Sequence, residues 1–100
     1  MYDHFETGKI VTISTAHLKP ETREFWDDCL LDTNGCFGTY DYTLYAKGGY
    51  GYFLYPESMV SEENTQDIVD VLHFAHAVNA DIVCFDADGP RVSGLATYDD

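Results

Sequence analysis

Cationic side chains are scarce in this sequence, which has 5 Lys and Arg against 18 Asp and Glu and a formal net charge of −13. Such a charge repels nucleic acid and anionic membranes, so direct binding to either is not expected. It also exceeds the magnitude of about 2–8 that keeps a small domain in solution. A salt-adapted surface and an acidic docking surface for a basic partner both account for this excess.

Long apolar runs are also missing, since no stretch approaches the roughly 18 residues that span a bilayer. The N-terminal MYDHFETGKI has neither the basic nor the apolar region of a signal peptide, so we expect a cytoplasmic protein. The three cysteines, Cys29, Cys36 and Cys84, form no Cys-x-x-Cys pair, which favours reduced thiols. The 45% of apolar residues that are present predict one folded domain over residues 1–100.

The first half of the chain predicts a strand, a helix and a hairpin. Residues 8–15 alternate as a strand, and Pro20 suits the first turn of a helix that ends at Asn34 and Gly35. Residues 37–57 predict a tyrosine-rich hairpin with its turn within residues 46–49. Two loops are compatible with this turn, so the register stays open.

The second half predicts another helix and one or two strands. Ser61 is expected to cap a helix that ends at Asn79, residues 81–86 form a buried strand, and residues 92–97 form a short last strand. This order predicts an α+β domain with a ferredoxin-like split β-α-β sandwich. In that fold, two helices lie on one face of a mixed sheet of four or five strands.

The segment IVCFDADGP, residues 82–90, resembles the motif that carries the nucleophile in haloacid-dehalogenase-like phosphatases. In such an enzyme Asp86 would attack and Asp88 would act as acid beside a magnesium ion. Only ten residues follow Pro90, too few for the rest of the sheet that this chemistry needs. We therefore interpret the segment as a strand ending in a turn with Gly89 at positive φ. A small metal-dependent hydrolase using Asp86, Asp88 and His17 is kept as the alternative.

Two other polar clusters also favour a structural interpretation. Asp70, His73 and His76 are metal-competent, but steps of three drift around a helix, which is typical of a solvated face. Ser14 and His17 have no nucleophile elbow around them and are expected where a strand leads into a helix. No metal, cofactor or catalytic residue is predicted.

Tyrosine density is the last signal, with six tyrosines between residues 40 and 55. Tyrosine is enriched in protein interfaces, and the acidic neighbours argue against RNA. The expected contacts to a basic partner are carboxylates of both helices and tyrosines of the hairpin: Glu24, Asp27, Asp28, Tyr40, Tyr42, Tyr50, Tyr52, Glu62, Glu63, Asp67 and Asp70.

The segments VTISTAHL, YGYFLYPE and DADGPRVSGLATYDD resemble a bacterial family of small acidic proteins of unknown function, encoded on phages, plasmids and integrative elements. The resemblance implies a setting in which small acidic proteins block host defences, and it transfers no catalytic residue. By analogy with acidic DNA mimics, we expect a non-enzymatic inhibitor of a basic host protein or nucleoprotein complex, such as a CRISPR effector or restriction system. An accessory subunit or homodimer built on an exposed edge strand of the hairpin is a further alternative.

Overall fold

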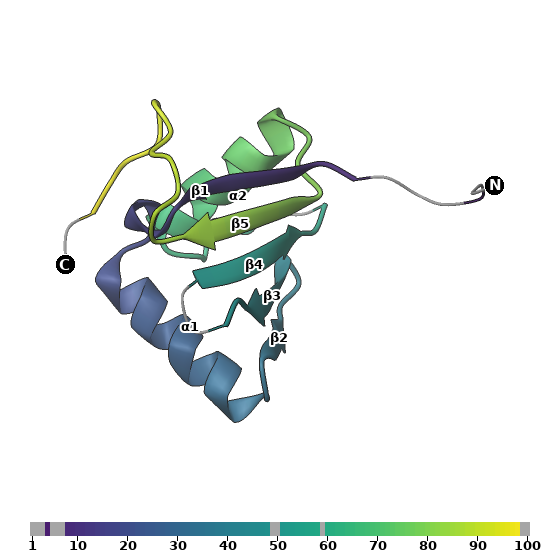
Figure 1. Ribbon diagram of the computed structural model, residues 1–100, viewed down its shortest axis with the longest axis vertical. Coiled ribbons are helices and arrows are strands. Elements are labelled where there is room, and N and C mark those ends of the chain that lie inside the picture. The colour runs from purple at the N-terminus through teal and green to yellow at the C-terminus, as the bar shows by residue number, and fades with distance from the viewer. Residues whose placement is uncertain (1–3, 5–7, 49–50, 59, 99–100) are drawn as a thin grey trace.

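The computed structural model describes residue 4 and residues 8–48, 51–58 and 60–98 (Figure 1). Along the chain the elements are β1 (Ile10–Ser14), the 3-10 turn η1 (Thr15–His17), α1 (Pro20–Asp32), β2 (Cys36–Gly38), β3 (Tyr42–Ala46), β4 (Gly51–Pro56), α2 (Gln66–Ala77) and β5 (Ile82–Asp86). No helix among the described residues is long and apolar enough to cross a membrane.

The five strands form one mixed sheet in the order β1-β5-β4-β3-β2. β1 runs parallel to β5, and each of the other neighbouring pairs is antiparallel. Two helices and this sheet confirm the predicted α+β class. The connections differ from a split β-α-β unit, because α1 joins the two edge strands and α2 joins the antiparallel neighbours β4 and β5. The fifth strand is β2, which the sequence analysis did not predict.

Both helices pack against the same face of the sheet (Figure 1). Residues directly opposite each other in paired strands point to the same side. The pairs Leu44–Leu54, Leu54–Val83 and Tyr52–Phe85 therefore share a face. Side chains of both helices join these strand residues in one buried cluster, which includes Ile13, Leu18, Trp26, Leu30, Tyr42, Leu44, Tyr52, Leu54, Ile68, Val71, Leu72, Ala75, Val83 and Phe85. The opposite face of the sheet carries no helix among the described residues.

The helix ends follow local chemistry, with one correction. α1 begins with Pro20 and ends before Asn34 and Gly35, whose φ angles of 58° and 94° stop the helix as predicted. α2 begins at Gln66 rather than at the residues after Ser61, so the predicted cap is wrong. Residues 61–64 instead form a turn, because the buried Asp41 carboxylate accepts hydrogen bonds from the side chain of Asn64 and from the backbone of Ser61.

The predicted strand at residues 92–97 is also wrong, because this segment folds back over the end of the sheet without pairing as a strand. Val92 and Leu95 pack against the core. The segment is anchored by the backbone N–H of Tyr98, which donates to the carbonyl of Ala16 at 2.7 Å. Both edges of β5 are already paired, by β1 and β4, so the chain that follows β5 has no free neighbour there.

Candidate functional site

α1 presents a row of carboxylates on the side that faces away from the sheet. Trp26 and Leu30 turn inward and are 0% and 6% exposed, which forces the acids between them into solvent. We call the five exposed carboxylates of α1 the acidic ridge: Glu21, Glu24, Asp27, Asp28 and Asp32. Three of these, Glu24, Asp27 and Asp28, were predicted as contacts from the sequence. Glu21 and Asp32 were not, although helical spacing places them beside Glu24 and Asp28.

The acidic ridge is dense and has apolar borders. α1 has 13 residues, so at about 1.5 Å per residue it carries roughly one carboxylate per 4 Å, close to the ~3.4 Å per phosphate of one DNA strand. Phe25 and Leu31 are 54% and 80% exposed on the same helix. Solubility alone does not require large apolar side chains beside the charges, whereas a protein contact uses both.

Two of the predicted tyrosine contacts lie in the core. Tyr42 and Tyr52 are 2% and 6% exposed, because they occupy the strand positions that face the helices. Their rings pack against Trp26, and the Trp26 Nε1–H donates to the Tyr42 hydroxyl at 3.2 Å. The Tyr52 hydroxyl donates a hydrogen bond to Asp27 at 2.6 Å. The pKa of Tyr52 lies well above its usual value, mainly because the hydroxyl is buried and also because of this hydrogen bond. The predicted surface role of Tyr42 and Tyr52 is therefore wrong.

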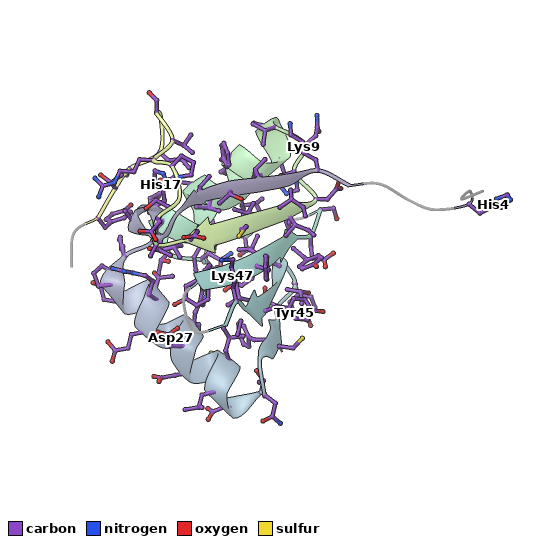
Figure 2. The ribbon with its side chains drawn as sticks, in the orientation of Figure 1. His4, Lys9, His17, Asp27, Tyr45 and Lys47 are labelled. Carbon is purple, nitrogen blue, oxygen red and sulfur yellow. The ribbon has the colours of Figure 1, made fainter. Side chains whose placement is uncertain are left out.

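The other described tyrosines of the hairpin are exposed to solvent. Tyr40 precedes β3 and is 92% exposed, while Tyr50 lies outside the described residues. Tyr45 and Tyr55, which the sequence analysis did not select, point to the face of the sheet without helices and are each 40% exposed. Figure 2 shows Tyr45 and Asp27 on opposite sides of the molecule. The alternation that buries Tyr42 and Tyr52 also exposes Tyr45 and Tyr55.

The acids of the α2 region have three different roles. Glu62 and Glu63 are exposed in the turn before the helix, and Asp70 is half-buried and accepts a hydrogen bond from Gln66 at 2.7 Å. Asp67 is only 1% exposed, so its predicted surface contact is wrong. Its carboxylate accepts the backbone N–H of Lys19 at 2.8 Å and thereby ties the start of α1 to the start of α2.

Two hollows border the acidic ridge. One, of about 290 Å³, lies between the start of α1 and the turn at residues 61–64, and Glu21, Phe25 and Glu63 are among its lining residues. The other, of about 570 Å³, lies between α1 and β4, and its lining includes Asp27 and Leu31. The fold thus brings Glu63 close to the ridge, and it places apolar walls next to carboxylates at both hollows.

The Asp-x-Asp segment forms the predicted turn. The Asp86 carboxylate accepts hydrogen bonds from the backbone N–H of Asp88 at 2.8 Å and from the ammonium of Lys47 at 3.1 Å. Both bonds lower the pKa of Asp86, and the bond from Asp88 has the larger effect. Gly89 does not have positive φ, which corrects the prediction. Glycine is required there because a Cβ would lie 2.7 Å from the carbonyl oxygen of Ile13. Within residues 8–48, 51–58 and 60–98, no group of acids, histidines and cysteines is arranged to hold a metal ion.

His17 is engaged by the backbone of the C-terminal segment (Figure 2). It is 1% exposed, with Nδ1 at 2.8 Å from the Ala96 carbonyl oxygen and Nε2 at 2.8 Å from the Val92 amide. An amide can only donate and a carbonyl can only accept, so the ring is neutral and carries its proton on Nδ1. Both ring nitrogens of His17 are therefore occupied by backbone groups of the C-terminal segment, and neither is free to act as a base or a ligand.

One protein-family model matches most of this chain. The model described as the family of unknown function (DUF5983) C-terminal domain matches residues 10–100. The chain belongs to the DUF5983 family. The match begins at the first residue of β1, so it includes the complete sheet, the acidic ridge and the His17-anchored segment. This match confirms the expectation that the chain belongs to a family of unknown function. No curated protein and no solved structure matched the chain.

Proposed function

We propose that this DUF5983 protein is a non-enzymatic inhibitor that presents the acidic ridge to a basic groove of a nucleic-acid-binding host complex. The observation that carries the proposal is the ridge itself, with five exposed carboxylates along one helix and exposed Phe25 and Leu31 beside them. The ridge offers Lys and Arg side chains a charge spacing near that of a phosphate strand. The apolar neighbours add contact area that phosphate does not provide.

The two hollows beside the ridge support a protein partner. A Lys or Arg side chain has a long apolar stem and a charged head, and it is held best where apolar walls end at a carboxylate. The 570 Å³ hollow offers this combination through Leu31 and Asp27, on the C-terminal side of Arg23, which lines the same hollow. We infer that the partner inserts such side chains while its groove follows α1. As part of this proposal, the protein acts in the cytoplasm of a bacterium as the product of a phage, plasmid or integrative element, where defence complexes are the targets.

The test is a competition experiment with purified DNA-binding defence complexes of the bacterial host, such as CRISPR effectors and restriction enzymes. Duplex DNA should displace the protein, and affinity should fall steeply between about 50 and 500 mM salt because the contact is electrostatic. The double variant Glu24→Gln, Asp28→Asn should lose about tenfold in affinity or more. Asp27 is left intact because it also binds Tyr52.

The matched control is the double variant Glu57→Gln, Asp88→Asn. It removes the same number of charges from exposed positions outside α1, and it should bind as tightly as the native protein. Equal losses in the two double variants would mean that only net charge matters. A salt-independent affinity, or binding that DNA does not displace, would overturn the proposal.

A further inference from the structure

The face of the sheet opposite the helices is largely apolar, and no element in the described part of the chain covers it. It consists of the alternate strand residues that do not enter the core, and we call it the open face: Ile10, Thr12, Ser14, Cys36, Gly38, Thr43, Tyr45, Gly51, Phe53, Tyr55, Ile82, Cys84 and, at one end, Asp86. Tyr45 and Tyr55 meet edge to face with ring centroids 5.2 Å apart. Ile10 is 59% exposed, and Phe53 is half-buried between the strands.

Charge is almost absent from the open face. Of its residues, all within the described part of the chain, only Asp86 is ionised at neutral pH, and it is paired with Lys47 at 3.1 Å. The whole chain has a net charge of −13. Carboxylates therefore concentrate elsewhere, and a basic partner finds no unpaired carboxylate on this face. The contact that suits the face is one between uncharged surfaces.

We propose that two copies of this chain associate through their open faces, sheet against sheet. Two chains of charge −13 repel each other unless their contact keeps the carboxylates apart. Stacked sheets lie about 10 Å apart and a helix is about 10 Å thick, so the two acidic ridges would be roughly 30 Å apart on the outer layers. That distance is more than three times the ~8 Å screening length at physiological salt. This arrangement also leaves both ridges free, so it does not depend on the function proposed for them.

The size of the open face predicts a weak dimer. Five strands about 4.8 Å apart and about 17 Å long give roughly 400 Å² per copy, or about 800 Å² in total. Stable interfaces bury about 1,200–2,000 Å², so the dimer belongs with weak and transient contacts. We expect a monomer at low micromolar concentration and a dimer of twice 11.3 kDa as the concentration approaches the millimolar range.

Sedimentation equilibrium over this concentration range tests the dimer, with Tyr45→Glu as the disrupting variant. The substitution places two buried carboxylates in the interface and should weaken dimerisation about tenfold or more. Tyr40→Glu is the matched control, because it makes the same chemical change at a tyrosine that is 92% exposed and not on the open face. Tyr40→Glu should dimerise like the native chain. If Tyr45→Glu does not fold, Thr12→Glu, at an exposed position of the same face, makes the same test.

NMR spectra at rising concentration locate the contact. Methyl signals of Ile10 and Ile82 and ring signals of Tyr45 and Tyr55 should shift, while methyl signals of Leu31 on α1 should not. A constant mass of 11.3 kDa up to millimolar concentration would overturn the proposal. Equal weakening by Tyr40→Glu, or shifts confined to α1, would also overturn it.

Discussion

The acidic ridge and the open face differ in charge and in how firmly the hydrophobic core anchors them. The acidic ridge lies on a helix whose inner side is anchored in the core through Trp26 and Leu30. Among the residues that the structure describes, the open face has strands but no second layer, and the one ionised group on it, Asp86, is paired with Lys47. A net charge of −13 therefore describes neither side well. The carboxylates gather where the core fixes their position, and the side without a covering layer stays nearly neutral, so the two sides suit different partners.

The largest effect should come from removing the anchor of the charged side. Trp26 is 0% exposed and contacts the rings of Tyr42, Tyr52 and Phe85, so Trp26→Ala should lower the free energy of unfolding by about 3–5 kcal/mol. On the open face, Tyr55 is 40% exposed, and Tyr55→Ala should cost about 1 kcal/mol or less. Urea denaturation at low micromolar concentration measures both. Similar losses would show that the open face is supported as firmly as the core.

Much of this division could be predicted from sequence. The spacing of Trp26 and Leu30 predicts the inner side of α1, and an apolar strand at residues 82–86 follows from its composition. The α+β class follows from the order of these elements. The acidic ridge was partly predicted because helical spacing is a local property.

The rest depends on contacts between distant parts of the chain. Alternation puts Tyr42 on the side of Leu44 and Tyr52 on the side of Leu54, but which of the two sides the helices cover depends on contacts with distant residues such as Trp26. α2 starts late because Asp41, twenty residues before Ser61, holds the preceding turn. His17 organises residues 92–98, which are 75 or more positions away along the chain. None of these contacts can be predicted from the residues that surround either partner in the sequence.

A smaller effect should appear at alkaline pH and should separate core tyrosines from surface tyrosines. Burial raises the pKa of Tyr42 and Tyr52 in the folded protein, whereas unfolded tyrosine ionises near pH 10. Above that pH the folded state binds more protons than the unfolded state, so stability is complete below about pH 10 and falls as pH rises.

Denaturation midpoints between about pH 8 and pH 11 test this expectation. Tyr52→Phe should show a shallower decline than the native protein, because one of the groups responsible has been removed. Tyr40→Phe, at a position that is 92% exposed, should decline as the native protein does. Parallel curves for all three proteins would show that burial of Tyr52 does not control the alkaline transition.

The smallest effect should come from removing the cation that is paired with the one charged residue of the open face. Lys47→Ala removes the partner of Asp86, and because the pair is solvent-accessible the stability of the monomer should hardly change. The unpaired carboxylate should instead weaken the proposed dimer a few-fold at low salt and less at high salt, since screening reduces the repulsion between two such charges. The double variant Lys47→Ala, Asp86→Asn restores a neutral face and should dimerise as the native chain does. If the single variant dimerises normally at low salt, neutrality is not what makes this face suitable for a second copy, and the contrast with the acidic ridge would then rest on shape alone.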